Sequence, residues 1–373
     1  MYARTNAEAE ERFVEQRFEF LAKSRELYPD APSSLDDLLK TPTQMLDPIV
    51  VSDLTALTKE EAQSIGNHIE RGYGVAAIVP LAFQRPASGE RHAILALIDR
   101  LTKTVPIGVP VDHPMEGHPE AISRFGKPDG TLKIYNLPVE KGGERCREQA
   151  ETNEMFHAHN DGLGYAGLIR TAVLVLDRPP LSGGYTFFQN LVRVAPALAQ
   201  HDPEAFKSLF LPNAITALRP RGKGAIKVES PVFFLGRDAA PQVFFRVSTG
   251  EYQMTWRRDP PLDRARAVLE ALCAPFGPGS RFVHLMRPGD TVLICNQQVA
   301  HGRTSFIDPP SGTGRVLARK WLVPTQDDAF YRHVPGMIID ERWASLFPNR
   351  FTGDAVTGDW RYDSVLGTNV RIE

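Results

Sequence analysis

The spacing of hydrophobic and polar positions changes near residue 105 of this 373-residue chain. Before that point, apolar side chains recur every three or four positions among many charges, which predicts amphipathic helices. The clearest helix start is Thr58 with Glu61 three residues later, the pattern of a capping box. The predicted helices cover 8–27, a short segment after Ser33, 58–71 and 90–103, and short strands are predicted at 46–51 and 72–79.

Beyond Pro106 the pattern becomes one of short apolar runs bounded by Gly, Pro, Asp and Asn, which is typical of strands. The runs cover 131–137, 171–176, 184–188, 231–235, 243–247, 281–285, 290–295 and 315–323. The segment 236–241 predicts a hairpin with a longer loop. Two helices, over 203–211 and 262–274, are expected to interrupt this region because apolar residues there return to helical spacing.

These elements predict a mainly β fold with flanking helices, organised as a single domain over 1–373. Residues 1–105 form its mainly helical N-terminal part, and 106–325 form a core that we expect to be a double-stranded β-helix, or jelly roll. The segment 326–373 is irregular, and its aromatic residues predict that it packs on the core. A jelly roll brings strands that are far apart in the sequence to one open end.

Composition narrows the functional classes. A net charge of −2 and a pI near 6.6 argue against a nucleic-acid or membrane partner, since neither is attracted by a near-neutral surface. Three widely spaced cysteines without a CxxC pair are typical of a reducing compartment. Because the chain has no run of 18 apolar residues and no apolar signal region, we expect a cytoplasmic protein. A homo-oligomer stays open.

The strongest chemical pattern is His159-x-Asp161, which is followed by Gly162. In an extended segment, residues 159 and 161 point to the same side and could hold one metal ion. Two histidines and one carboxylate form the facial triad of non-haem Fe(II) oxygenases, and the candidate third ligand is His301. His157 leaves an alternative open, because His157 and His159 would also share a face. A structural zinc site would instead close with four ligands.

Two arginines follow the third candidate ligand. Arg315 and Arg319 lie four residues apart on a predicted strand, so they share a face. Two guanidiniums beside a metal repel each other unless anions bind there, and each is suited to a bidentate grip on a carboxylate. The alternative is that both are surface arginines of an edge strand.

At this point the sequence resembles the taurine dioxygenase-like family of Fe(II)/2-oxoglutarate oxygenases, in the clavaminate synthase-like superfamily. The resemblance spans about 150–325 and rests on four ordered motifs. They are Phe156-His-Ala-His159-Asn-Asp161-Gly, Gly183-Gly184-Tyr-Thr186-Phe-Phe-Gln-Asn190, Arg287-Pro-Gly-Asp290-Thr-Val-Leu-Ile-Cys-Asn296 with His301-Gly-Arg-Thr, and Arg315-Val-Leu-Ala-Arg319.

The resemblance implies a role for each matched position. His159, Asp161 and His301 would bind Fe(II), and Thr186 with Arg315 would hold the distal carboxylate of 2-oxoglutarate. Arg319 would bind an acidic group of the substrate. The extra histidine, His157, departs from the family pattern, and we expect it to line the substrate pocket. A carboxylate at position 161 argues against the halogenase variants of the family.

The function expected from the resemblance is O2-dependent oxidation, most often hydroxylation, of a small molecule that bears a carboxylate. Candidate substrates include an amino acid or a natural-product intermediate, because Arg319 could pair with a carboxylate. Two alternatives remain. The chain could be a jelly-roll binding or sensor protein without turnover, or a zinc hydrolase that uses the same ligands; the paired arginines count against the hydrolase.

Overall fold

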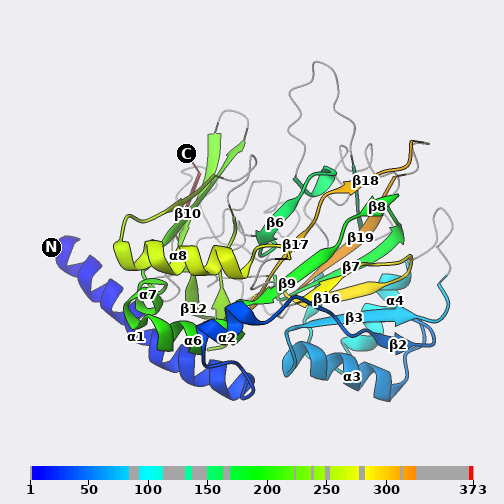
Figure 1. Cartoon of the computed structure of the whole chain (residues 1–373), viewed down its shortest axis with the longest axis horizontal. Helices are drawn as coiled ribbons and strands as arrows, with labels where there is room; N and C mark the ends of the chain where they lie inside the picture. The colour runs from blue at the N-terminus through cyan, green and yellow to red at the C-terminus, as the bar shows by residue number, and fades with distance from the viewer. Residues whose placement is uncertain are drawn as a thin grey trace.

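Two β-sheets packed face to face form the centre of the protein, and helices cover the outer face of each (Figure 1). The structure is a computed structural model. It describes residues 2–83, 92–111, 131–136, 149–162, 169–221, 224–236, 239–247, 253–276, 282–310, 314–324 and 369–372.

The helices of the described chain are interspersed with the strands along the sequence. They are α1 (Tyr2–Leu27), α2 (Leu35–Lys40), α3 (Lys59–Glu70), α4 (Ala93–Leu101), the 3-10 turn η1 (Gln149–Glu151), α6 (Leu191–His201), α7 (Pro203–Ser208) and α8 (Pro260–Leu272). None of these described helices is both long enough and apolar enough to span a membrane.

One central sheet has five strands, in the order β1-β15-β9-β17-β6. These are β1 (Gln44–Met45), β15 (Phe282–His284), β9 (Thr186–Asn190), β17 (Val299–Arg303) and β6 (Phe156–His159). The facing sheet has the order β2-β3-β16-β7-β19-β4, and β5 also pairs with β19. Its strands are β2 (Ile49–Val51), β3 (Val75–Pro80), β16 (Thr291–Cys295), β7 (Thr171–Arg178), β19 (Val316–Val323), β4 (Val109–Val111) and β5 (Leu132–Tyr135).

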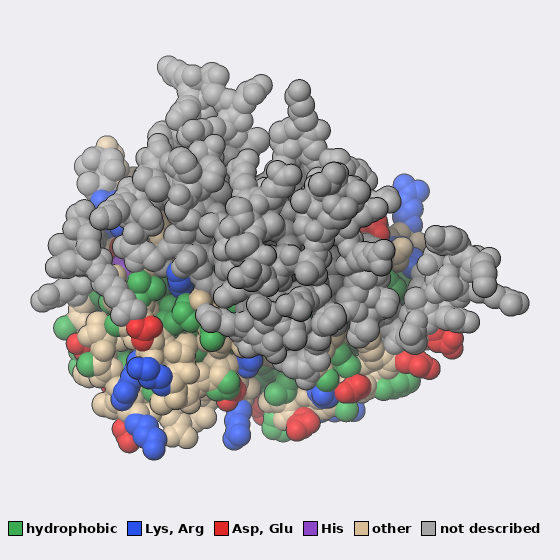
Figure 2. Space-filling model, turned by 180° about the vertical axis from the view of Figure 1, so that it is seen from behind, with side chains coloured by type: hydrophobic (Ala, Val, Ile, Leu, Met, Phe, Trp, Pro, Cys, Tyr) green, Lys and Arg blue, Asp and Glu red, His purple; other side chains and the backbone are tan. Residues whose placement is uncertain are grey.

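Three smaller sheets extend this core. They comprise β14 (Gln253–Trp256), β10 (Ile215–Arg221), β11 (Gly224–Ser230) and β20 (Asn369–Ile372) in one sheet, β12 (Phe233–Leu235) with β13 (Pro241–Val243), and β18 (Phe306–Ile307) with β8 (Ser182–Gly183). On the face seen in Figure 2, the acidic and basic side chains of the described surface are interspersed, as a net charge of −2 suggests.

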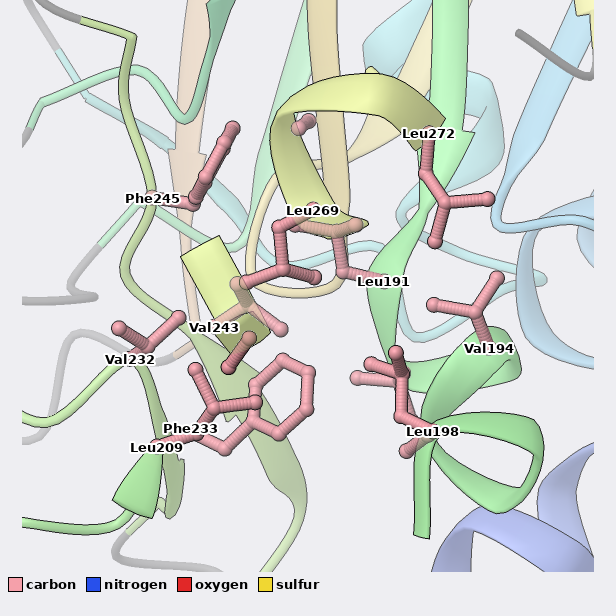
Figure 3. Close-up of a cluster of buried hydrophobic side chains, with 14 of the residues drawn as sticks. Leu191, Val194, Leu198, Leu209, Val232, Phe233, Val243, Phe245, Leu269 and Leu272 are labelled. Atoms are coloured by element: carbon pink, nitrogen blue, oxygen red, sulfur yellow. The ribbon is translucent and has the colours of Figure 1, made fainter. Parts of the chain in front are cut away.

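The buried side chains form three layers. Between the two sheets lie residues such as Phe188, Leu174 and Val292, which point inward from β9, β7 and β16. Helices α3 and α4 cover the outer face of the seven-stranded sheet. Helices α1, α2, α6, α7 and α8 cover the five-stranded sheet, where α6 and α8 meet the β12–β13 hairpin (Figure 3). Burial of apolar area in these layers is the main force that holds the sheets together.

The jelly-roll expectation is confirmed by this architecture, and the predicted strands recur with ends shifted by a few residues. The run 243–247 was expected to be strand, yet only its first residue belongs to β13. Several described elements were not predicted, among them β11, β14, β17 and two that contain proline. Helix α6 contains Pro196, a residue that removes a helical hydrogen bond, and β10 contains Pro220, a residue rare in strand interiors.

Some expectations lie largely outside the described residues. The C-terminal segment 326–373 is described only at 369–372, where β20 pairs with β11. Cys146 also lies outside the described part. Neither of the two described cysteines, Cys273 and Cys295, forms a disulfide bond.

The capping box predicted for α3 is present. The Thr58 hydroxyl accepts a hydrogen bond from the Glu61 backbone N–H, and the Glu61 carboxylate accepts one from the Thr58 N–H. We expect Thr58→Ala to lower the free energy of unfolding by about 1 kcal/mol, because the Glu61 N–H at the start of the helix loses its acceptor, the Thr58 hydroxyl. Urea unfolding would show a lower midpoint with an unchanged slope. The exposed Thr55→Ala is the control, and equal losses in both variants would contradict the prediction.

Candidate metal centre

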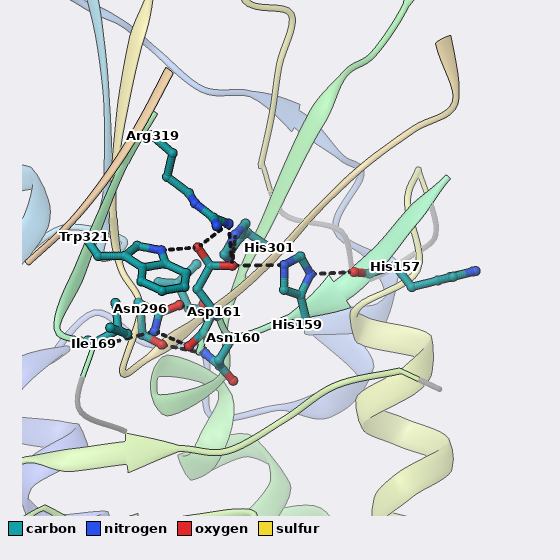
Figure 4. A network of polar contacts seen from close by, with 10 residues as sticks. His157, His159, Asn160, Asp161, Ile169, Asn296, His301, Arg319 and Trp321 are labelled. Carbon is teal, nitrogen blue, oxygen red and sulfur yellow. Dashed lines mark hydrogen bonds and ion pairs between the residues drawn. The ribbon is translucent and has the colours of Figure 1, made fainter. Parts of the chain in front are cut away.

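Two neighbouring strands of the five-stranded sheet bring three candidate ligands together. His159 ends β6, Asp161 follows two residues later, and His301 lies on β17 directly opposite His159. Residues opposite each other in antiparallel strands project to the same face. One ligand atom from each of the three side chains lies within 4.8 Å of the others, and all three residues are buried (Figure 4). The structure therefore places the predicted triad in one cluster.

The orientation of the His159 ring is determined by the strand itself. Its Nδ1 lies 2.8 Å from the backbone oxygen of His157. A carbonyl oxygen only accepts, so Nδ1 carries the proton and Nε2 keeps a lone pair. Nε2 is buried, makes no hydrogen bond with the described residues, and lies 3.4 Å from Oδ1 of Asp161. A buried lone pair that faces a carboxylate is suited to a metal ion.

The protonation states of the three side chains also suit a metal ion. Burial lowers the pKa of His159 despite the nearby Asp161, and burial with the neighbouring His159 lowers the pKa of His301 to about 3. Burial alone would raise the pKa of Asp161, but Arg319 and the two imidazoles hold it well below its usual range. Two neutral imidazoles and an ionised carboxylate are the forms that bind divalent metals. The donor set fits Fe(II) with three protein ligands.

Two asparagine side chains hold the ligand strand in place. Asn296, just after β16, accepts a hydrogen bond from the Asp161 N–H at 2.6 Å and donates to the carbonyl oxygens of Asp161 and Ile169, each at 3.0 Å. Asn160 donates to the carbonyl oxygens of Asn296 and Val299 and accepts from the Phe245 N–H. The backbone on both sides of Asn160 is thus fixed by buried hydrogen bonds.

The predicted anion-binding residues line the same pocket as the triad. Thr186 of β9, Arg315 before β19 and Arg319 within β19 all face it, together with the apolar side chains of Ile134, Ala150, Phe156, Leu174 and Leu317. Burial lowers the pKa of Arg315 to about 10. Burial and the charge of Arg315 lower the pKa of Arg303, which also lines the pocket, to about 9. Buried guanidiniums close together favour the binding of an anion.

Arg319 has a partner in the site. Its Nη1 lies 3.5 and 3.4 Å from the two oxygens of Asp161, and its guanidinium stacks over the Trp321 ring at 4.4 Å. The ring of His157 points away from the triad, and only its carbonyl oxygen takes part (Figure 4). The structure does not bring that ring into the cluster, so its role in substrate binding stays a prediction.

Three residues of the site were not singled out from the sequence. Trp321 donates from Nε1 to Oδ2 of Asp161 at 2.7 Å. Arg246 is buried opposite His159, and Asn296 forms the backbone contacts described above. Trp321 lies two residues after Arg319, so the argument that places residues 315 and 319 on one face of the strand also places residue 321 there. Arg246 carried no comparable signal.

Comparison with known proteins places this geometry in context. The family described as "Taurine catabolism dioxygenase TauD, TfdA family" matches residues 87–321. A uridine-5'-phosphate dioxygenase from Streptomyces sp is 29% identical over 191 residues, which cover 46% of this chain and 65% of that relative. The match thus spans just under two thirds of the relative's length.

Among solved structures, the chain is similar to asparagine oxygenase in complex with Fe(II), 2S,3S-3-hydroxyasparagine and succinate. The TM-score is 0.50 at 17% identity, and the match covers 84% of this chain and 94% of that one. This likeness concerns the fold, and it agrees with the jelly roll expected from the sequence.

The contacts of Asn296 generate a prediction. We expect Asn296→Ala to lower the free energy of unfolding by about 2–4 kcal/mol, because three buried hydrogen bonds are lost. We also expect the dissociation constant for Fe(II) to rise roughly 10- to 100-fold, because the segment that carries Asp161 loosens. Urea unfolding and anaerobic metal titration measure the two effects. The control is Asn213→Ala, since Asn213 is exposed and accepts one hydrogen bond from Arg257. A loss of stability with unchanged Fe(II) affinity would mean that Asn296 stabilises the fold but does not position the metal site.

Proposed function

The chain belongs to the taurine catabolism dioxygenase TauD, TfdA family, and from this we propose that it is an Fe(II)- and 2-oxoglutarate-dependent dioxygenase acting on a small anionic molecule. The observation that carries the proposal is the buried cluster of His159, Asp161 and His301, whose ligand atoms come from two strands and lie within 4.8 Å of one another. Iron bound there would supply the oxidative decarboxylation of 2-oxoglutarate to succinate and carbon dioxide, coupled to oxidation of the substrate by O2.

The residues of the pocket divide the remaining tasks. His159, Asp161 and His301 hold the ion as two neutral imidazoles and one carboxylate. Arg315 and Thr186 hold the distal carboxylate of 2-oxoglutarate, since both line the pocket and a guanidinium grips a carboxylate with two parallel hydrogen bonds. Apolar side chains such as Leu174 and Leu317 limit the entry of water. No acid–base pair is required of the protein.

An anionic substrate is supported by the charges around the pocket. Arg246, Arg303, Arg315 and Arg319 are all buried there or beside the triad. The relative named uridine-5'-phosphate dioxygenase takes a phosphate ester, which is anionic. We therefore extend the carboxylate-bearing substrates expected from the sequence to phosphate esters. Arg319 remains the proposed anchor, because its side chain lines the same pocket as the triad.

We infer further that the protein works without a nucleic-acid or membrane partner and in a reducing compartment such as the cytoplasm. The net charge of −2 supports the first inference, and the lack of a disulfide at the described Cys273 and Cys295 supports the second.

The ligand assignment is tested by removing single ligands. We expect His159→Ala and Asp161→Ala to lose at least about 99% of succinate release from 2-oxoglutarate, because two remaining ligands hold the ion poorly. Succinate is measured with ferrous iron and ascorbate over a panel of carboxylates and phosphate esters, each beside its neutral amide or alcohol. The control is His201→Ala, an exposed histidine at the end of α6. Full activity in either ligand variant would refute the assignment.

The same panel of compounds, tested with ferrous iron and with zinc, separates the proposed oxygenase from a non-catalytic binding protein and from a zinc hydrolase. A binding or sensor protein would take up 2-oxoglutarate but release no succinate with any compound of the panel. A zinc hydrolase would be active with zinc and indifferent to ferrous iron, whereas the proposed oxygenase should be inhibited by zinc.

The role of Arg315 gives a separate prediction. We expect Arg315→Gln to raise the dissociation constant for 2-oxoglutarate at least roughly tenfold, because a buried charge-assisted contact is lost. Metal affinity should be unchanged, since Arg315 makes no described contact with the triad. Anaerobic titration of the metal-loaded protein measures both. Arg258→Gln, at an exposed position, is the control, and equal 2-oxoglutarate affinity in the two variants would exclude Arg315 from the co-substrate site.

A further inference from the structure

The carboxylate of Asp161 is held from the opposite sheet by two side chains of β19. Arg319 and Trp321 lie two positions apart on β19, so their side chains point to the same face of the sheet, which is the inner one. Arg319 Nη1 lies 3.5 Å from Oδ1 and 3.4 Å from Oδ2, whereas Trp321 Nε1 lies 2.7 Å from Oδ2 alone (Figure 4). Arg319 therefore treats the two oxygens almost equally, and the indole N–H distinguishes them.

The two oxygens also face different groups. Oδ1 lies 3.4 Å from Nε2 of His159 and 4.0 Å from Nε2 of His301. Oδ2 points to the indole of Trp321. A distance of 2.7 Å is short for an N–H···O contact and is typical of a bond to an ionised acceptor. One oxygen is thus turned towards the imidazoles while the other is occupied by a donor.

We propose that Trp321 is a positioning residue that restricts Asp161 to one metal-ligating oxygen, Oδ1. This inference rests on the proposed function, since it concerns the same ion. In a six-coordinate site, three protein ligands leave three positions, and 2-oxoglutarate and O2 need all three. A carboxylate free to rotate could offer both oxygens and take a fourth position. The indole N–H prevents this by keeping Oδ2 engaged.

A purely structural role for Trp321 makes a different prediction. The side chain is buried in the layer between the sheets and carries the guanidinium of Arg319 on its ring. Trp321→Phe keeps an aromatic ring for both contacts but lacks the N–H. If packing were the whole role, this variant would lose some stability while the metal site kept its properties.

The first experiment compares wild type and Trp321→Phe after loading with Mn(II). Water-proton relaxation reports the number of exchangeable waters on the ion. We expect wild type to hold three and the variant two, a loss of about one third. In the Fe(II)-loaded protein, the dissociation constant for 2-oxoglutarate should rise roughly 10- to 100-fold, the range found when outer contacts of metal ligands are removed. Equal water counts and equal 2-oxoglutarate affinity would overturn the proposal.

A double-mutant comparison tests whether the effect passes through Asp161. In an Asp161→Ala background, at Mn(II) concentrations that saturate the weakened site, Trp321→Phe should leave the number of exchangeable waters on the ion unchanged, because the carboxylate on which it acts is gone. An effect as large as in the wild-type background would assign Trp321 a role independent of Asp161 and would overturn the proposal.

A measurement on the wild-type protein covers the case in which Trp321→Phe does not fold. The chain has four tryptophans, so the indole N–H signals of ¹⁵N-labelled protein are few. The Trp321 signal should stay shifted by its hydrogen bond and protected from exchange when diamagnetic Zn(II) is added. Release of this N–H on Zn(II) binding would mean that both oxygens of Asp161 turn to the metal, against the proposal.

The outcomes distinguish this proposal from the proposed function. If wild type binds Mn(II) but not 2-oxoglutarate, the proposed function fails, and the water count and the indole signal still decide the role of Trp321. If wild type binds no divalent metal at the triad, both fail. If succinate is released by wild type but Trp321→Phe is indistinguishable from it, only the role of Trp321 is refuted.

Discussion

The constraint on which this site depends is the burial of one ionised carboxylate. Asp161 is only 8% exposed, and an isolated charge in such a place would cost several kcal/mol. The fold compensates this charge from the facing sheet, through the guanidinium of Arg319 and the indole N–H of Trp321. Because both partners belong to β19, the two sheets must meet at Asp161 for its carboxylate to be satisfied.

The architecture makes this meeting possible. Strand β17 lies between β9 and β6, so His301 lies opposite His159, while β19 in the facing sheet contributes both Arg319 and Trp321. Separate helical layers cover the outer faces, and the interior between the sheets contains a pocket at the triad that is lined by both polar and apolar side chains. Asn296 links the end of β16 to the backbone of Asp161, which ties the ligand segment to the seven-stranded sheet.

The sequence predicted those elements whose structure is determined by a local pattern of residues. Continuous apolar runs predicted β7, β16 and β19, and the Thr58 capping pattern predicted the start of α3. It failed where tertiary contacts overrule local preference, as in α6, which tolerates Pro196 because most of its other side chains are buried. The contacts of Asp161 with Asn296 and Trp321 join residues 135 and 160 positions apart. No periodicity reports such pairs, so the sequence could suggest the candidate ligands but not the groups that orient them.

The arginines near the pocket are not equivalent, and this bears on what binds there. Arg303 donates to the backbone oxygens of Thr152, Glu154 and Thr304, so its charge is fixed in place by the chain itself. Arg319 is directed at Asp161. Arg315 lies near enough to Arg303 for its charge to lower the pKa of that guanidinium. The native fold therefore carries an electrostatic cost at Arg303 and Arg315 that a bound dianion would relieve. An anion bound there gains affinity from this relief, and because it binds the native state alone it also shifts the unfolding equilibrium towards the folded protein.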